Sequence, residues 1–397
     1  MYTLWHLIEV FLNQPLIKST FKYFFDTWFI WAPILAAYLF WESWLNYIHS
    51  VFIRNLSWVL LEIKIPREIA KSPKAMEVVL NALHNTRSGN LIERYWEGFL
   101  RMWYSLEIVS IEGQIHFYLY VMKPFRNFFE AQIYSQYPGA EIIEAEDYVQ
   151  ILSSRDLGKG WEAWGAEFFL AKEEAYPIRT YVDFGLEGSK AKEEEKIDPL
   201  TSFLEALGSI GEGEQIWFQI LVRAADKEWK DKAGAIIEEI QKKKGAVEVE
   251  DVFSRMLLSP GQREVLLAVE HNVAKLGYET GIRIIYVAKK DLFNSSRKSI
   301  VSNSMKQYNT QNMNSFRPKT TSIDYFFVNT REAWLKRRLL RAYQKRSWFY
   351  IPYRRRKYVL NTESLATIFH FPGRVAETPT LGRIEAKRGE PPINLPI

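Results

Sequence analysis

The feature that most constrains this 397-residue chain is an apolar and aromatic stretch near its N-terminus. Residues 28–52 read WFIWAPILAAYLFWESWLNYIHSVF, with one acid, Glu42, and no Lys or Arg. A helix rises 1.5 Å per residue, so about 20 residues cross a hydrocarbon core of about 30 Å. The stretch therefore predicts a single transmembrane helix at about residues 28–50, with interfacial tryptophans as its anchors: Trp28, Trp31, Trp41 and Trp44.

A signal peptide and a buried core helix are the alternatives to this anchor. A signal peptide would lie nearer the terminus, with a basic n-region and a small-residue cleavage site. Basic residues are more numerous after the span (Arg54, Lys64, Arg67, Lys71 and Lys74) than before it (Lys18 and Lys22). The positive-inside rule then predicts a single-pass protein of the cytoplasmic (inner) membrane with its C-terminal domains in the cytoplasm. Residues 3–24 are interpreted as an interfacial helix or a second short span.

After the anchor (residues 1–55), the pattern predicts an α+β domain over residues 56–155. Strands are expected at 58–66, 105–111, 114–121 and 140–148, with helices at 73–84 and 124–137. The second and third strands are expected to pair as a hairpin across Glu112-Gly113. This β-α-β-β-α-β order is typical of ferredoxin-like domains.

A second α+β domain is predicted over residues 160–330, possessing strands near 166–171, 215–222 and 281–289. Asp198-Pro199 and Ser259-Pro260 open two of its helices. It is interpreted as a diverged copy of the first domain with an insertion around 245–258. Residues 331–397 are expected to form a basic helix, a short helix and a proline-rich linker.

Motifs for catalysis are missing from the sequence. There is no cysteine, and the six histidines show no metal-ligand spacing. The glycine-rich turn at 208–213 carries Glu212 and precedes Glu214, both of which repel phosphate, and no GK[ST] follows. An acidic run at 144–147 is more simply a solvated strand edge than a metal site. The sequence therefore predicts no enzyme, no cofactor and no metal.

One segment concentrates positive charge, although the net charge is only +5. Between residues 336 and 357 there are ten basic residues and no acid: Lys336, Arg337, Arg338, Arg341, Lys345, Arg346, Arg354, Arg355, Arg356 and Lys357. Aromatic residues are interleaved with them. The segment is open to three interpretations: a solvated basic face, contact with anionic lipid headgroups, or contact with nucleic-acid phosphates with bases stacked on the aromatics.

Several long phrases carry a resemblance to a known family: RNLSWVLLEIKIPREIAKSPKAMEVVLNALH (54–84), SLEIVSI (105–111), FRNFFEAQIYSQYPGAEI (125–142), YVLNTESLATIFHFPG (358–373) and PPINLPI (391–397). From about residue 25 to its end the chain resembles the membrane-anchored N-terminal region of type IV secretion and conjugative DNA-transfer ATPases of the coupling-protein, HerA-like kind in genome-reduced uncultured bacteria. In that family the NLP phrase precedes a RecA-like motor domain with a glycine-Lys-Ser/Thr loop, and this chain has no such loop.

The resemblance implies a location at the membrane and an association with the transfer machinery, but it assigns no catalytic activity to this chain. The expected function is a membrane-anchored, non-catalytic component of a DNA-transfer machine. Its expected partners are the membrane, a separately encoded RecA/HerA-like ATPase and DNA, and it is expected to be an oligomer. The alternative is a self-standing membrane-tethered scaffold, or a lipid- or peptide-binding protein with no motor partner.

Overall fold

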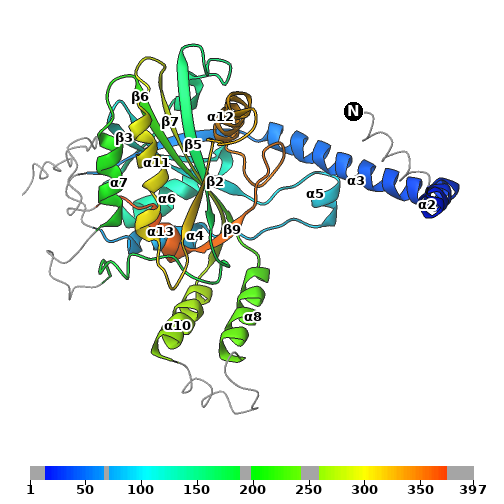
Figure 1. Cartoon of the computed structure of the whole chain (residues 1–397). Helices are drawn as coiled ribbons and strands as arrows, with labels where there is room; N and C mark the ends of the chain where they lie inside the picture. Colours follow the sequence, from blue (N-terminus) through cyan, green and yellow to red (C-terminus); the bar gives the residue numbers. More distant parts are fainter. Residues whose placement is uncertain (1–13, 67–70, 188–197, 243–258, 373–397) are drawn as a thin grey trace, which may run out of the picture. The chain divides into compact units, whose positions relative to one another are not determined.

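The computed structural model describes residues 14–66, 71–187, 198–242 and 259–372 (Figure 1). The chain forms two compact units. The smaller unit has two segments, the chain up to Leu56 and Ser88–Leu100. The larger unit consists of Ser57–Arg87 and the chain from Arg101 onward. The predicted proline-rich linker from residue 373 onward and the beginning of the predicted interfacial helix lie outside the described residues.

The smaller unit is built around one long helix. Its helices are α2 (Pro15–Asp26), α3 (Trp28–Asn55) and the short α5 (Leu91–Tyr95). The indole nitrogen of Trp44 donates to the carbonyl oxygen of Tyr95 at 2.9 Å, which ties α5 to α3. Gly98 adopts φ +71°, and a Cβ there would lie 2.5 Å from the carbonyl oxygen of Ile48. Only glycine combines this backbone conformation with so close an approach to α3.

Helix α3 confirms the helix predicted at about residues 28–50. Of the predicted anchor tryptophans, Trp28 and Trp41 are exposed, whereas Trp44 packs edge-on against Trp96. Large apolar side chains along the same helix also face solvent, with Ile34 67% and Phe40 68% exposed. Within the part of the chain that the structure describes, no helix combines the length and the apolar content needed to cross a membrane.

The larger unit is organised around one antiparallel sheet, in which the described residues form nine strands. This confirms the coarse α+β class. The strands are β1 (Trp58–Lys64), β2 (Trp103–Ile111), β3 (Gln114–Met122), β4 (Glu141–Glu144), β5 (Trp161–Leu170), β6 (Glu214–Ala224), β7 (Gly277–Lys289), β8 (Phe316–Thr320) and β9 (Tyr358–Asn361). Their order is β4-β1-β3-β2-β6-β7-β5-β8, and β9 pairs with β7. The predicted hairpin of β2 and β3 is confirmed, and its turn residues Glu112 and Gly113 both have positive φ.

The two halves of this sheet have matching strand orders. The chain β1-α4-β2-β3-α6-β4 gives the order β4-β1-β3-β2, and the chain β5-α7-β6-β7-α11-β8 gives β8-β5-β7-β6. The halves meet where β2 pairs with β6, from Trp103↔Arg223 to Ile111↔Gln215. The helices concerned are α4 (Lys74–Leu83), α6 (Arg126–Gln136), α7 (Pro199–Gly208) and α11 (Lys298–Asn303); α8 (Glu228–Lys242) and α10 (Pro260–Ala274) lie between β6 and β7.

The sheet separates two layers of different composition. Apolar side chains of α4, α6, α7, α11 and α13 (Thr362–Ile368) pack on one face together with Leu106 and Ile108 of β2. The opposite face, which carries Val109 of the same strand, packs against α12 (Val328–Gln344) and residues 148–157. Figure 1 shows α12 apart from the other helices of this unit. Residues alternate between the two faces along β2, as the period of a strand requires.

A row of polar residues crosses the α12 face of the sheet. The register aligns Glu62, Tyr118, Glu107, Gln219, Arg283 and Glu167 on successive strands. Glu107, Gln219 and Arg283 in the middle of this row have no exposed surface. Buried charges are stable only when they are paired and hydrogen-bonded. This row therefore needs counter-charges from the layer that covers it.

Candidate nucleic-acid interface

The most buried member of the basic segment is Arg346, which is 2% exposed. Its guanidinium donates to Glu107 through Nε at 3.0 Å, and to both carboxylate oxygens of Asp147 at 2.8 Å. It also lies 3.9 Å from the ring centroid of Tyr120. Glu107 accepts further hydrogen bonds from Ser105 at 2.6 Å, Gln219 at 2.7 Å and Tyr148 at 2.8 Å. Arg346 is thus the counter-charge for the polar row.

The surroundings of Arg346 keep it charged. Burial alone disfavours the cation, but the carboxylates of Glu107 and Asp147 more than offset this cost and raise the pKa of Arg346. A phosphate group from solvent cannot reach this guanidinium. The prediction that Arg346 contacts nucleic acid or lipid is therefore replaced by a structural role beneath α12.

Three further cations of the segment are held in ion pairs within the chain. Lys336 contacts Glu162 at 2.6 Å, Arg355 contacts Glu167 at 2.9 Å, and Lys357 contacts Glu279. Glu167 and Glu279 are themselves buried. Four of the ten basic residues are therefore neutralised locally or placed on the sheet. Substituting Arg354, Arg355 and Arg356 together would remove the partner of Glu167 as well as surface charge.

Three arginines of α12 remain together at the surface. Arg337, Arg338 and Arg341 line a hollow of about 660 Å³, together with Trp334, Tyr353 and three small neighbours: Thr330, Ala333 and Pro352. We call this hollow the arginine groove. No carboxylate is among these lining residues. The guanidinium of Arg338 lies 4.9 Å from the centroid of the Trp334 ring, and Arg341 donates to Ser154 at 2.8 Å. The groove therefore offers clustered cations beside aromatic rings, the combination that binds nucleic-acid backbones and bases.

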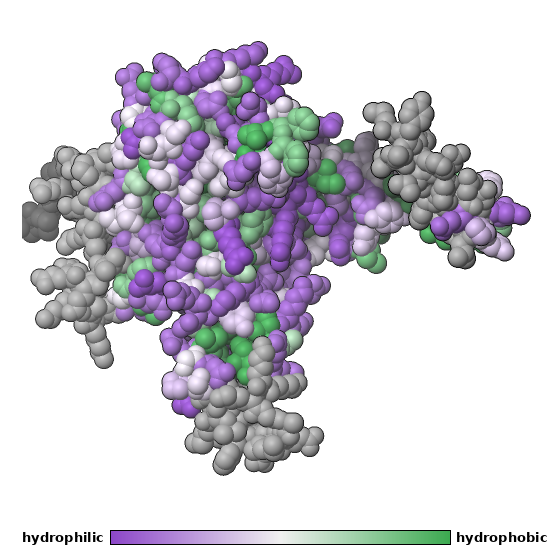
Figure 2. All heavy atoms as spheres, viewed as in Figure 1, coloured by the Kyte–Doolittle hydropathy of each residue, from purple (hydrophilic) through white to green (hydrophobic). Residues whose placement is uncertain are grey.

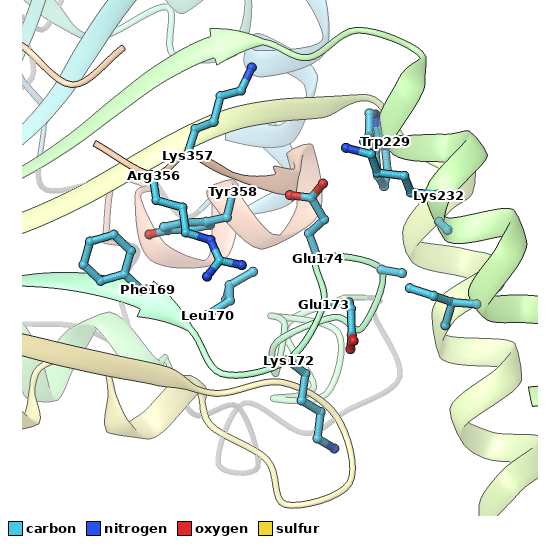
Figure 3. A pocket seen from close by; sticks show the side chains of 13 residues that line it. Phe169, Leu170, Lys172, Glu173, Glu174, Trp229, Lys232, Arg356, Lys357 and Tyr358 are labelled. Carbon is cyan, nitrogen blue, oxygen red and sulfur yellow. The ribbon is translucent and has the colours of Figure 1, made fainter. Parts of the chain in front are cut away.

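The other candidate residues lie away from the groove or at its rim. The ammonium group of Lys345 is 6.0 Å from the Tyr353 ring, and Arg354 is exposed. Arg356 lines a separate hollow of about 320 Å³ between β5 and α8. Figure 3 shows Arg356 and Glu174 directed toward the middle of this hollow, while Lys172 and Lys357 extend away from it. Its mixed charge makes it a poorer site for a polyanion than the arginine groove.

Sequence reasoning missed Trp334. This side chain is 56% exposed although it is large and aromatic. Its signal was present: Arg337, Arg338 and Arg341 follow it by three, four and seven residues, which are the spacings of one helix face. The aromatic residues expected to lie among the cations do not share one surface. Trp348, Phe349 and Tyr358 are buried, whereas Tyr353 lines the groove.

A third hollow, of about 580 Å³, is lined by a histidine and a carboxylate that pair with each other. His271 of α10 lies 2.9 Å from Glu363 of α13, and Lys275 and Thr180 also bond Glu363. Burial disfavours the ionised carboxyl, but these three hydrogen bonds outweigh it and lower the pKa of Glu363. Among the described residues no three His, Asp or Glu side chains form a cluster able to hold a metal ion.

Acid is expected to destabilise the larger unit through Glu363 and Asp198. His370 and the backbone amide of Leu200 lower the pKa of Asp198 even though burial opposes them. Both carboxyls therefore bind protons more tightly in the unfolded chain than in the folded protein. Their contribution to stability is complete above their ordinary pKa values of 4.5 and 3.8, and it is lost as the pH falls from there through the lowered pKa values of the folded state. Urea midpoints measured from pH 7 to pH 3 should fall, and Glu363→Gln should flatten the decline. The exposed Glu212→Gln serves as the control, and equal slopes for all three proteins would contradict this assignment.

Comparison with known proteins places the chain in a family whose function is not established. Residues 53–383 match the family model of a domain of unknown function, DUF8128. No curated protein matches the chain. The matched range includes all strands of the sheet, α12 and the arginine groove. Because it spans most of the sequence, the chain belongs to the DUF8128 family.

Proposed function

We propose that this chain is a membrane-attached, non-catalytic component of a type IV secretion or conjugation-like DNA-transfer machine, and that its arginine groove contacts DNA. The observation that carries the proposal is the grouping of Arg337, Arg338 and Arg341 without a carboxylate in the lining, beside Trp334 and Tyr353. Phosphate contacts supply most of the sequence-independent affinity for DNA. Exposed aromatic rings add stacking with unpaired bases.

The membrane part of the proposal rests on α3. Its apolar side chains, such as Ile34, Leu39 and Phe40, are exposed, so the described part of the smaller unit does not cover them. Apolar surface of this kind is stabilised by transfer out of water. We place the chain at the cytoplasmic membrane, with the larger unit on the cytoplasmic side. The sequence resemblance further supports a role beside a RecA- or HerA-like ATPase in an oligomeric assembly.

The finer fold assignment also belongs to this proposal. Each half of the sheet is taken as a ferredoxin-like unit, and the two halves as products of a duplication. The matching strand orders on either side of the β2–β6 pair support this relationship. A sheet continued across the pair gives α12 one broad platform, from which the arginine groove faces solvent.

The proposal is tested by DNA binding of the full chain in lipid nanodiscs. Fluorescence anisotropy with labelled single-stranded and duplex DNA should show binding at about 50 mM salt that weakens steeply by about 200 mM. The cause is that counterions released from the phosphates gain less entropy when they enter a more concentrated salt solution. An absence of binding at about 50 mM salt would remove the DNA role. In the same preparation, ATP with magnesium should give no turnover.

A membrane-tethered scaffold without DNA contact is the second candidate. The observation that favours it is the internal pairing of Lys336, Arg346, Arg355 and Lys357, which assigns much of the basic segment to the fold. The two candidates differ in one result: the scaffold would float with vesicles and leave labelled DNA unbound.

A further inference from the structure

A second surface feature lies at the start of α12, in the connection from β8. Tyr325, Phe326 and Phe327 are consecutive aromatic residues that are 64%, 79% and 82% exposed. We call them the aromatic loop. Figure 2 shows a largely hydrophilic surface in this view, with apolar side chains gathered between α8 and α10 and near α12. Exposed aromatic side chains in succession are unusual for a protein surface, and such surface marks an interaction site.

The backbone holds these rings outward. Phe326 and Phe327 have φ values of 43° and 51°, in the left-handed region that residues other than glycine rarely adopt. Arg331 donates to the carbonyl oxygens of Tyr325 at 3.1 Å and Phe326 at 3.4 Å. The amide of Ile323 donates to Glu332 at 3.1 Å. Residues of the first turns of α12 thus stabilise an unfavourable loop conformation that keeps apolar rings in water, which is expected where another surface receives them.

The charges around the loop indicate what that surface is. The chain from residue 317 to residue 341 contains seven Lys or Arg and two acids, and of these cations Lys336 is paired with Glu162. Arg331 lies over the Tyr325 ring at 5.4 Å from its centroid, so a cation is held at the base of the loop. Aromatic rings that enter the interfacial region, with arginines beside them at headgroup level, are typical of attachment to an anionic bilayer.

We propose that the aromatic loop inserts into an anionic lipid surface and seats the larger unit on the membrane. The side chains of Phe326 and Phe327 enter the interface, and Arg331 contacts lipid phosphates. This goes beyond the proposed function, since it gives the larger unit a membrane contact of its own and does not depend on DNA binding at the arginine groove. A docking site for another protein is the alternative occupant.

The chain contains no cysteine, so a single reporter can be placed on the loop. Phe326→Cys is labelled with the environment-sensitive dye NBD in the full-length protein, and Phe327→Cys provides a second reading. Ile151→Cys, at a residue 59% exposed in the larger unit, is the matched control. Vesicles of phosphatidylcholine with about 30% phosphatidylglycerol are compared with phosphatidylcholine alone, and lipids carrying a doxyl quencher report depth.

The loop labels should gain emission several-fold, shift to shorter wavelength and be quenched by doxyl lipids on the anionic vesicles, while the label at residue 151 stays unchanged. Vesicle flotation separates this inference from the proposed membrane attachment. If the chain floats while both loop labels keep their emission in water, the loop proposal fails and the attachment by α3 stands. If the chain does not float with anionic vesicles, both fail.

Discussion

Replacing Arg346 with methionine is expected to lower the free energy of unfolding by about 3–5 kcal/mol, the range for removing one partner of a buried ion pair. Methionine preserves much of the side-chain volume but leaves the carboxylate of Glu107 without its cation. Glu107 has no exposed surface and cannot be solvated by a simple rotamer change. Urea denaturation followed by circular dichroism of the larger unit measures the loss. Adding Glu107→Gln should recover part of it, because the uncompensated charge is then gone.

Arg283→Met is the matched control for this prediction. Arg283 is equally buried, but it makes one direct hydrogen bond, from Nη2 to the carbonyl oxygen of Ser347 at 2.6 Å. Burial lowers the pKa of Arg283 to about 10 despite the nearby Glu167, so its charge is held at a cost at neutral pH. Its removal should cost about 0.5–1.5 kcal/mol, as for one hydrogen bond. Equal losses for both variants would contradict the role assigned to Arg346.

Local patterns allowed much of the first half of the sheet to be predicted. Strand length and alternation indicate β2 and β3, and Glu112-Gly113 supplies the turn that joins them. The pairing of β2 with β6 was not predictable in the same way, because the two strands are separated by about a hundred residues and no turn connects them. Either edge of a strand can accept a neighbour, so local sequence does not select between two sheets and one.

The basic segment was conspicuous from composition, yet its division into buried and exposed cations was not. The partners of Lys336, Arg346 and Arg355 lie more than 170 residues earlier in the sequence. A partial signal did exist in the strands, since a polar residue stands between two apolar neighbours in the middle of each: Glu62, Glu107, Gln219, Arg283 and Glu167. Polar residues in the middle of buried strands require counter-charges, and the nearest large supply of cations is the segment after residue 335.

Loss of the three groove arginines is expected to weaken DNA binding at least about tenfold at about 50 mM salt and to reduce the slope of log affinity against log salt by about 2–3, since each phosphate contact contributes about 0.9. The variant is Arg337→Gln, Arg338→Gln and Arg341→Gln, in which glutamine keeps part of the apolar stem that packs along α12. Anisotropy titrations at several salt concentrations measure both quantities.

The matched control removes the same charge elsewhere on the larger unit, through Lys159→Gln, Lys227→Gln and Lys306→Gln at exposed positions. Both triple variants change the net charge equally, so a loss confined to the groove variant separates local phosphate contact from general attraction.

Trp334→Ala tests whether the groove also stacks bases or recognises charge alone. Stacking of a base on this ring contributes about 1–3 kcal/mol without releasing counterions, so affinity for single-stranded DNA should fall while the salt slope stays unchanged. A groove that recognises only charge would leave the affinity of the Trp334→Ala variant intact, and DNA would then pass over α12 as a backbone without its bases being held.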